Sequence, residues 1–232
     1  MDLNIQNQVV IVTGGSEGIG EGIVRSIVRE GGIPVITGRD KRTGENLVNE
    51  FQNERKEAFF IEVSLSSIET CQMVVDKTLD RYGRINALVN NDALNDGVGL
   101  ENGSPDQFQR SLLSNLGHYY HLAYYCLDAL KKTKGTIINI SSKTALTGQG
   151  NTSGYAASKG AQLALTKAWS EELNKYGIRV NAIVPTEVKR MTTIEETGDI
   201  VAFLISESAI KTTGEFIFVN DGYAHLDQAL SR

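Results

Sequence analysis

The sequence is poor in the residues that mark special classes of protein. It has 3 prolines, 2 cysteines, 3 histidines and 1 tryptophan among 232 residues. Cys71 and Cys126 form neither a disulfide framework nor a metal-ligand pattern, so we expect packed thiols in a reducing compartment and no metal site. No apolar run approaches the length of a membrane span, and the N-terminus lacks the regions of a signal peptide. These absences predict a soluble, cytoplasmic protein.

Positive charge is not in excess either. The chain carries 23 Lys and Arg against 28 Asp and Glu, a formal net charge of −5 at pH 7. This balance argues against nucleic acid or an anionic membrane surface as the main partner. Glycine is abundant instead, with 23 residues, which suits tight turns and close backbone contacts.

Short apolar runs alternate with longer amphipathic stretches along the chain. The apolar runs are almost continuous, which is typical of parallel strands covered on both faces. We therefore predict one α/β domain over residues 1–232, a Rossmann-like, doubly wound parallel sheet of about seven strands with helices on both faces. The expected strands span 9–15, 33–38, 57–64, 85–91, 135–141, 178–185 and 214–220, and the expected helices span 18–32, 41–55, 67–83, 105–132, 153–176 and 195–206.

Glycines gather in the turn after the first expected strand, in "TGGSEGIG" at residues 13–20. Gly14 allows a tight turn, Gly18 lets the backbone approach a pyrophosphate at the helix N-terminus, and Gly20 lets helix and strand pack closely. The alternative is a purely structural glycine turn. The strand–turn–helix context favours a phosphate cradle for a dinucleotide.

The spacing TGxxxGxG resembles that of the short-chain dehydrogenase/reductase family, and the resemblance extends over nearly the whole chain. The family has a catalytic serine at the end of the fifth strand and a YxxxK pair on the next helix. These match Ser142 in "INISS", and Tyr155 and Lys159 in "YAASK". The family's fourth catalytic residue matches Asn115, on the preceding long helix. A Tyr–Lys pair alone could be incidental, but its order and spacing after Ser142 favour the catalytic reading.

The chemistry of hydride transfer accounts for these residue types. A phenol with a pKa near 10 is a poor base at neutral pH, and an ammonium one helical turn away favours the phenolate. Tyr155 would then act as general base in oxidation and as general acid in reduction, while Ser142 holds the substrate oxygen. The resemblance implies that Lys159 also binds the nicotinamide ribose and that Asn115 anchors a water of a proton relay. Ser141 is expected to make only structural hydrogen bonds.

The end of the second expected strand, "ITGRDKR", bears on the choice of cofactor. Gly38 stands where an acidic residue would bind the ribose of NAD, and the guanidinium of Arg39 suits a 2′-phosphate. Asp40 either opposes this interpretation or caps a helix. We expect NADP, with NAD possible. The cofactor contacts implied by the resemblance are Gly14, Ser16, Glu17, Gly18, Ile19, Gly20, Arg39, Ser64, Leu65, Asn90, Tyr155, Lys159, Pro185 and Val188.

The sequence departs from the family pattern at three places. The family motif NNAG reads "NNDA" here, with Asp92 and Ala93 in place of a small residue and a glycine. Ser64 stands where the family often has an aspartate. After Pro185, where the family has a glycine and a long segment over the substrate, only a short stretch near 186–198 is present. It is either a shortened lid or a region from which a segment is missing.

The expected substrate pocket is rich in polar residues, which disfavours steroid or acyl-chain substrates. Three stretches, "NDGVGLE", "SSKTALTGQGNTSGYAASKGAQLALT" and "DGYAHLDQAL", together resemble the sugar-oxidising, L-fucose dehydrogenase-like members of the family. That resemblance implies oxidation of an aldose to its lactone. The alternatives are a reductase of ketones or 3-oxoacyl groups, and a cofactor-sensing protein without turnover. The candidate substrate contacts are Ser142, Lys143, Thr144, Gln149, Asn151 and Glu187.

The stretch "HYYHLAYYC" at 118–126 carries more aromatic residues than a solvated helix face usually does. The resemblance implies assembly through the two long helices, as a homotetramer or homodimer. The alternative is that these rings belong to the core of a single chain.

Overall fold

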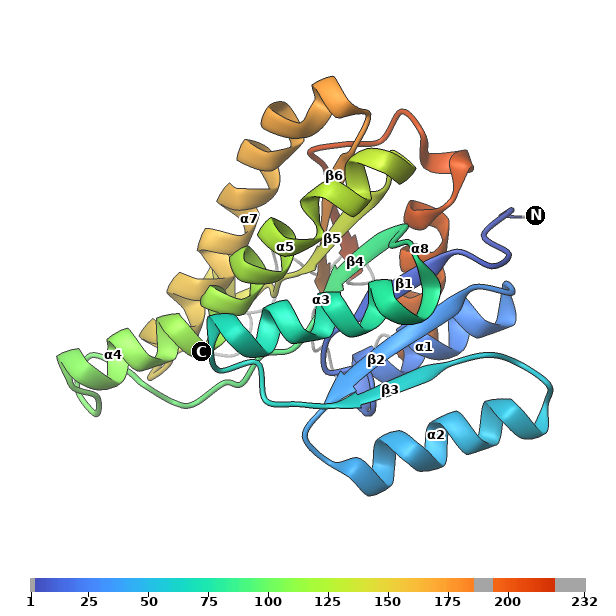
Figure 1. Cartoon of the computed structure of the whole chain (residues 1–232). Coiled ribbons are helices and arrows are strands. Elements are labelled where there is room, and N and C mark those ends of the chain that lie inside the picture. Colours follow the sequence, from blue (N-terminus) through green and yellow to red (C-terminus); the bar gives the residue numbers. More distant parts are fainter. Residues whose placement is uncertain (1–2, 186–193, 220–232) are drawn as a thin grey trace.

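The computed structural model describes residues 3–185 and 194–219. Seven parallel strands form its central sheet: β1 (Val9–Val12), β2 (Ile33–Gly38), β3 (Phe59–Glu62), β4 (Ala87–Asn90), β5 (Thr136–Ile140), β6 (Arg179–Pro185) and β7 (Phe216–Val219). They pair in the order β3-β2-β1-β4-β5-β6-β7, so the chain builds one half of the sheet outward from β1 and then the other half outward from β4 (Figure 1). The doubly wound parallel sheet predicted from the sequence is confirmed.

Helices cover both faces of the sheet (Figure 1). One face carries α1 (Gly18–Arg29), α2 (Lys41–Asn53) and α8 (Ile194–Ile205). The opposite face carries α3 (Ile68–Tyr82), α5 (His118–Thr133) and α7 (Ser153–Leu173). The shorter elements are α4 (Pro105–Leu112), α6 (Thr144–Thr147), the π-helical turn η1 (Leu113–Gly117), and the 3-10 turns η2 (Asn174–Tyr176) and η3 (Glu207–Ala209).

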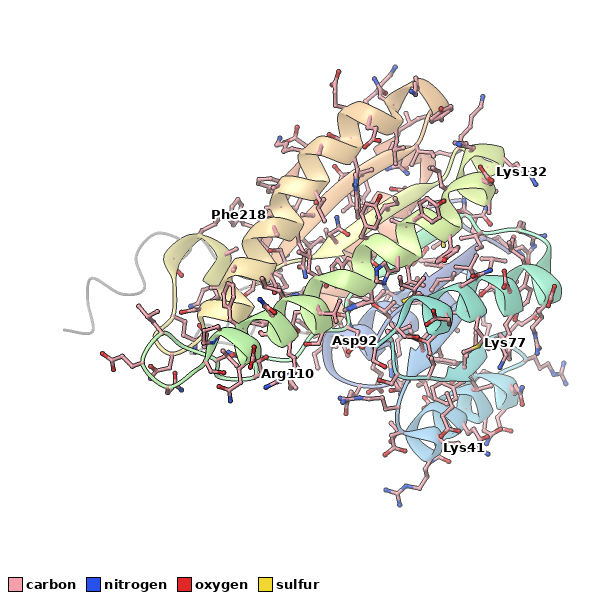
Figure 2. The ribbon with its side chains drawn as sticks, turned by 60° about the vertical axis from the view of Figure 1, so that its left-hand side comes forward. Lys41, Lys77, Asp92, Arg110, Lys132 and Phe218 are labelled. Atoms are coloured by element: carbon pink, nitrogen blue, oxygen red, sulfur yellow. The ribbon has the colours of Figure 1, made fainter. Side chains whose placement is uncertain are left out.

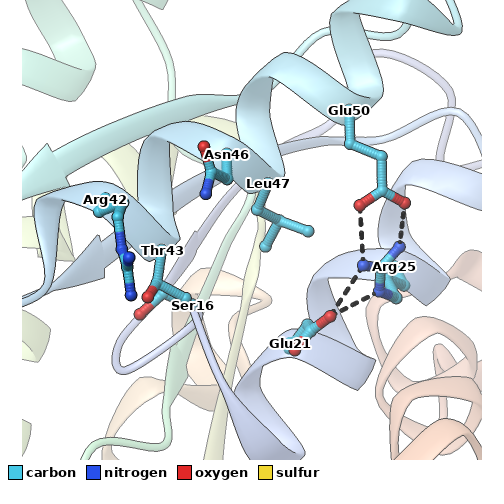
Figure 3. A pocket seen from close by; sticks show the side chains of 8 residues that line it. All are labelled: Ser16, Glu21, Arg25, Arg42, Thr43, Asn46, Leu47 and Glu50. Carbon is cyan, nitrogen blue, oxygen red and sulfur yellow. Dashed lines mark hydrogen bonds and ion pairs between the residues drawn. The ribbon is translucent and has the colours of Figure 1, made fainter.

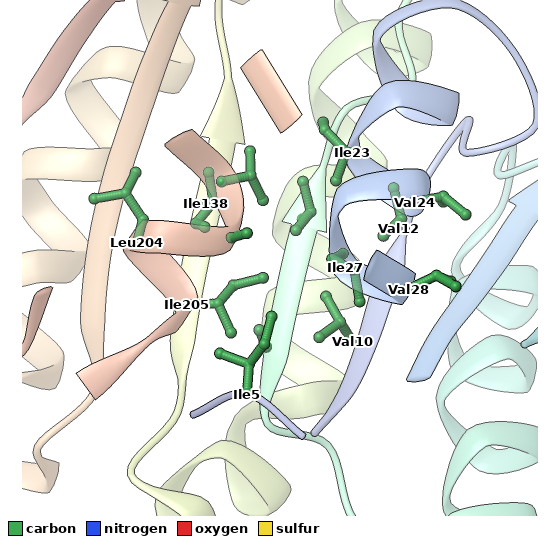
Figure 4. Close-up of a cluster of buried hydrophobic side chains, with 14 of the residues drawn as sticks. Ile5, Val10, Val12, Ile23, Val24, Ile27, Val28, Ile138, Leu204 and Ile205 are labelled. Carbon is green, nitrogen blue, oxygen red and sulfur yellow. The ribbon is translucent and has the colours of Figure 1, made fainter. Parts of the chain in front are cut away.

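Strand β1 belongs to the cores on both faces, because alternate residues of a strand point in opposite directions. Val10 and Val12 pack with α1 and α8 (Figure 4) and belong to the same buried cluster as residues of α2, whereas Val9 and Ile11 pack with α3, α5 and α7. All four side chains are fully buried, which accounts for the unbroken apolar run in the sequence. Each contributes about 1.5–3 kcal/mol through burial. The core therefore holds β1 from both sides and positions the glycine turn that follows it.

The prediction of one long helix over 105–132 is wrong in one respect. It is divided into α4 and α5 by η1, where the backbone adopts a π-helical turn. Inside this turn Asn115 is buried, and its Oδ1 accepts a hydrogen bond from the amide of Leu94 at 2.7 Å. A single wide turn of this kind leaves the apolar periodicity on either side almost intact, so the sequence pattern does not reveal it.

Most other element ends agree with the sequence pattern within a few residues. The strand expected over 57–64 is shorter, because β3 ends at Glu62, and the single turn of α6 was not expected. Val188 and Glu187, which were predicted to contact cofactor and substrate, lie outside the described residues, as does most of the segment 186–198. In the described part of the chain, no helix is both long and apolar enough to cross a membrane.

Helices α1 and α8 pack closely through glycines. A Cβ at Gly198 would overlap the carbonyl of Gly22, and a Cβ at Gly22 would overlap Ile194 at the start of α8, so both positions require the smallest side chain. Ser26 donates a hydrogen bond to Asp199 at 2.8 Å, and Arg29 pairs with the same carboxylate. This contact with α8 fixes α1, the helix that begins in the glycine turn.

Candidate functional site

The glycine turn between β1 and α1 has the geometry of a phosphate cradle. Gly14 and Gly18 adopt left-handed backbone angles, with φ of 59° and 55°. A Cβ at Gly20 would overlap the carbonyl of Gly14, so this glycine allows the helix to approach the turn. A Cβ at Gly18 would meet nothing within 4 Å, so this part of the backbone faces open space. The open backbone lies at the N-terminus of α1, where anions are favoured.

The loop after β4 is fixed beside this turn. The hydroxyl of Thr13 accepts hydrogen bonds from the amides of Asn91 and Asp92, at 2.8 and 2.9 Å. Nε2 of His118 donates to the carbonyl of Asp92 at 3.0 Å, and Gly14 lies against the backbone of Asp92. In the side-chain view Asp92 lies in the middle of the molecule, near the start of α5 (Figure 2).

Asn90, predicted to contact the cofactor, directs its side chain into the sheet. It is fully buried, and its Nδ2 donates to Oδ1 of Asn139 on β5 at 3.1 Å. Asn139 in turn donates to the hydroxyl of Thr166 on α7 at 2.9 Å. This side chain therefore ties β4 to β5 and α7 through its Nδ2, while its buried Oδ1 has no hydrogen-bond partner within the described residues.

A cavity of about 680 Å³ opens beside the glycine turn, at the carboxyl ends of β1 and β2. Asp40 caps α2, accepting from the amide of Thr43 at 3.0 Å, which confirms its alternative role as an N-cap. Neither Arg39 nor Arg42 forms an ion pair within the described residues. Ile19, Ser64 and Leu65, predicted to contact the cofactor, do not line this cavity. Its lining residues are Gly14, Ser16, Glu17, Gly38, Arg39, Asp40, Lys41, Arg42 and Asp92.

A smaller cavity of about 260 Å³ lies between α1 and α2 and shares Ser16 and Arg42 with the first (Figure 3). Its central cation is Arg25, which pairs with Glu21 at 2.8 Å and with Glu50 at 2.6 Å. Both carboxylates raise the pKa of the Arg25 guanidinium, chiefly through the hydrogen bond to Glu50. Because Arg25 is already neutralised, Arg42 is the cation in this region that can meet an anion.

The two serines after β5 have different partners. Ser141 is buried and donates to the backbone carbonyl of Lys159 at 2.9 Å, as expected of a structural hydrogen bond. Ser142 is half-buried, and its hydroxyl contacts the amide and hydroxyl of Thr144, both at 3.2 Å. The Thr144 hydroxyl reaches Oε1 of Gln149 at 3.5 Å. The structure thus brings together three of the predicted substrate residues, of which Gln149 is exposed, as is Asn151.

Lys159, which was predicted to favour the Tyr155 phenolate and to bind the nicotinamide ribose, is buried, with 2% of its surface exposed. Its ammonium donates to the carbonyl of Ile140 at 2.7 Å and to the hydroxyl of Tyr119 at 3.3 Å. Nζ lies 5.6 Å from the centre of the half-buried Tyr155 ring. Burial lowers the pKa of Lys159 to about 7, and the negative charge of Asp92 opposes this shift.

Sequence reasoning missed four residues of this region. Gln162 on α7 donates to the carbonyl of Asn115 at 2.9 Å, so that carbonyl already has a partner within the chain. His118 and Tyr119 were interpreted as aromatics of a core or an interface, yet they contact Asp92 and Lys159. Arg42 follows Arg39 by three positions in "GRDKR", a signal that could have been used.

These features define a class of protein. An open cradle at the first strand–helix turn lies at the point where the strand order reverses, which is where doubly wound folds bind dinucleotides. Ser142, Tyr155 and Lys159 lie at the ends of the adjacent β5 and α7, on the same edge of the sheet. The fold and the site are those of an oxidoreductase that uses a nicotinamide dinucleotide.

The chain belongs to the short-chain dehydrogenase family, whose family model matches residues 8–199. The L-fucose dehydrogenase of Bos taurus is 35% identical over 189 residues, covering 81% of this chain and 68% of that protein. The L-fucose dehydrogenase of Mus musculus is 37% identical over 182 residues, covering 78% and 65%. The chain therefore spans about two thirds of the length of these relatives.

Two further relatives align with almost the whole chain. The 3-oxoacyl-(acyl-carrier-protein) reductase FabG of Chlamydia pneumoniae is 28% identical over 248 residues, covering 97% of this chain and 100% of that protein. The crystal structure of Cj0485 dehydrogenase is 39% identical, covers 99% of both chains and superimposes with a TM-score of 0.92. These comparisons establish the family and the fold. The names of the relatives include both a dehydrogenase and a reductase, which act on different substrates.

The Thr13 hydroxyl accepts hydrogen bonds from two backbone amides, so its removal should destabilise the protein. Replacing Thr13 by Val keeps the shape of the side chain and leaves the amides of Asn91 and Asp92 without their acceptor. We expect Thr13→Val to lower the free energy of unfolding by about 1–3 kcal/mol, measured by urea denaturation. Thr13→Ser, which keeps the hydroxyl, is the control. Equal losses in the two variants would contradict the assigned role.

Proposed function

We propose that this protein is an NAD(P)-dependent dehydrogenase that oxidises an aldose such as L-fucose to its lactone. The observation that supports it most is the polar chain Ser142–Thr144–Gln149, which joins hydroxyl and amide groups between the end of β5 and the start of α7, the helix that carries Tyr155. A sugar offers hydroxyls to such groups, whereas an acyl chain or a steroid offers apolar surface. The similarity to L-fucose dehydrogenases supports the same substrate class.

The roles of the catalytic residues follow from their chemistry. The bound cofactor supplies the acceptor for a hydride. Tyr155 takes the proton of the substrate hydroxyl as general base, and Ser142 orients that hydroxyl by a hydrogen bond. The ammonium of Lys159, 5.6 Å from the Tyr155 ring, favours the phenolate. Asn115 holds the loop after β4 through the amide of Leu94, so we assign it a positioning role.

The residues of the cavity fit a dinucleotide, and they favour NADP. Arg39 and Arg42 lie beside the end of β2 without ion pairs in the described part of the chain, where a 2′-phosphate can pair with them. A Cβ at Gly38 would lie 2.7 Å from the hydroxyl of Ser16, so an acidic side chain of the kind that binds NAD is not easily accommodated. The buried, free cysteines fit a reducing compartment such as the cytoplasm.

A panel of substrates tests the proposed activity. We expect reduction of NADP or NAD with L-fucose or a related aldose, and little activity with apolar alcohols. Tyr155→Phe is expected to lower kcat by about 10²–10⁴-fold because the proton acceptor is lost. Cofactor binding, followed by nicotinamide fluorescence, should persist in this variant. Turnover confined to 3-oxoacyl thioesters would overturn the sugar assignment and favour the function of the FabG relative. Binding of cofactor without turnover of any substrate would favour a sensing role.

The choice of cofactor is tested by removing the two guanidinium groups. We expect Arg39→Ala and Arg42→Ala each to raise KM for NADP about tenfold or more, because each loses a charged hydrogen bond to the 2′-phosphate. KM for NAD should change little, since NAD lacks that phosphate. Lys56→Ala, which removes a cation from the exposed loop after α2, is the control. A wild-type preference for NAD in kcat/KM would contradict the assignment.

We further propose that the chain forms a homotetramer or homodimer through α5 and α7. Tyr120 and Tyr124 of α5 are stacked at 6.5 Å, and Tyr120 lies 6.3 Å from Trp169 of α7. Tyr124 is 63% exposed in the single chain, so this aromatic surface is available to a second copy.

Sedimentation velocity tests this assembly. We expect Tyr124→Arg to shift the protein to a smaller species, because a charge in the centre of an apolar interface is costly. Ile210→Arg, which changes a residue of 64% exposure outside α5 and α7, should leave the wild-type species unchanged. A monomeric wild-type protein would contradict the proposed assembly.

A further inference from the structure

The first turn of α7, which carries Tyr155, begins without a side-chain cap. Thr152 stands at the N-cap position and makes no capping hydrogen bond there. The amide of Gly154 is one of those at a helix start that the helix itself cannot satisfy. It donates instead to the carbonyl of Val98 at 3.1 Å, in the loop between β4 and α4. A segment from another part of the chain therefore fixes the start of this helix.

Val98 is able to fix the helix because its own loop is braced. The side chain of Asn102 accepts a hydrogen bond from the amide of Gly99 at 3.0 Å and donates to the carbonyl of Gly97 at 2.9 Å. These two contacts lie on either side of Val98 in the chain. The carbonyl that receives the amide of Gly154 is therefore held in place by the loop around it.

Helix α4 lies beside the same turn of α7 (Figure 1). A Cβ at Gly154 would overlap Oγ of Ser111 on α4 and would lie 2.6 Å from Cβ of that serine. The Ser111 side chain is 1% exposed, so it is enclosed by its neighbours and cannot turn out to solvent. Its hydroxyl has no hydrogen-bond partner within the described residues, so it meets Gly154 as packed volume. Position 154 therefore requires glycine as long as position 111 carries a side chain.

The carbonyl of Gly154 is occupied as well. Ser158 is fully buried, and its hydroxyl donates to this carbonyl at 2.9 Å. Gly154 is thus held at its amide, at its Cα and at its carbonyl. Tyr155 is the next residue in the chain, and Lys159 directly follows Ser158. A displacement of this turn would carry the phenol and the ammonium with it.

We propose that Ser111 and Gly154 are positioning residues, and that the close contact between them sets the place of Tyr155 at the site. A misplacement of a reacting group by a fraction of its own size can cost an enzyme much of its rate. The consequence for turnover rests on the proposed function, in which Tyr155 moves the proton of the substrate. The geometric part, that added volume at this contact displaces Tyr155, depends on no substrate or cofactor.

A double-mutant cycle tests the contact. Gly154→Ala inserts the Cβ that overlaps, and Ser111→Gly removes the atoms that it would meet. We expect Gly154→Ala to lower kcat about 10- to 10²-fold because Tyr155 is displaced. The double variant should recover most of this loss, and Ser111→Gly alone should lower kcat less than Gly154→Ala does. KM for the cofactor should change less than about threefold, because neither residue lines the cavity beside the glycine turn.

Gly160→Ala is the matched control, since it makes the same substitution further along the same helix. A Cβ at this position would meet nothing within 4 Å. We therefore expect kcat of this variant to equal that of the wild-type protein. An equal loss in Gly160→Ala, or no recovery in the folded double variant, would overturn the proposal.

NMR of the protein with 13C-labelled tyrosine rings gives a readout that needs no substrate. Tyr155→Phe identifies the signal of Tyr155. We expect this signal to be displaced in Gly154→Ala, to return towards its wild-type position in the double variant, and to stay in place in Gly160→Ala. A Tyr155 signal that is the same in Gly154→Ala as in the wild-type protein would contradict the proposal.

Circular dichroism and thermal unfolding verify that each variant is folded. If Gly154→Ala does not fold, Ser111→Cys supplies the milder change, because the larger sulfur replaces Oγ and presses on Gly154 from α4. It should displace the Tyr155 signal in NMR and lower kcat by a smaller factor, and an unmoved signal would again overturn the proposal. If the wild-type protein oxidises no substrate, the proposed function fails, while the NMR comparison still decides the role of Ser111 and Gly154.

Discussion

The hydroxyl of Thr13 joins the ends of β1 and β4, and the candidate site depends on this joint. These two strands are neighbours in the sheet, but the connections that follow them run to opposite faces. Such a reversal leaves a crevice in which backbone groups lack strand partners. Thr13 satisfies two amides of the loop after β4, so that loop is held against the glycine turn instead of spreading away from it. The Thr13 hydroxyl thereby holds the two sides of the crevice together.

A second set of contacts positions the catalytic candidates on the other side of β4. The π-helical turn η1 directs the side-chain amide of Asn115 to the loop after β4. The backbone carbonyl of Asn115 accepts a hydrogen bond from Gln162 of α7. One turn later, Tyr119 binds the ammonium of Lys159, which also contacts the end of β5. Helix α5 therefore fixes both the loop and α7, and its position depends on the extra width of η1. A regular helix over the same residues would displace these contacts relative to one another.

The sequence predicts the sheet, the order of the elements and the cradle because those features depend on local patterns. An unbroken apolar run indicates a strand buried on both faces, and the glycine spacing reflects the backbone angles of Gly14 and Gly18. The contacts of His118 with Asp92 could not be predicted, since they join elements 26 positions apart without a periodic signal. The inward direction of Asn90 was missed for a similar reason, because its partner Asn139 lies on a different strand.

The charges of the site are arranged in the order of the strands. Arg39 and Arg42 follow β2, the neutral glycine backbone follows β1, Asp92 follows β4, and Lys159 lies beside the end of β5. A carboxylate next to a phosphate cradle would oppose an anionic ligand if no cation stood beyond it. Lys159 is that cation, and its burial strengthens the interaction because the surroundings screen it weakly. The negative charge of Asp92 raises the pKa of Lys159 against the lowering effect of burial, so the carboxylate that departs from the family pattern acts on the lysine as well as on an anionic ligand.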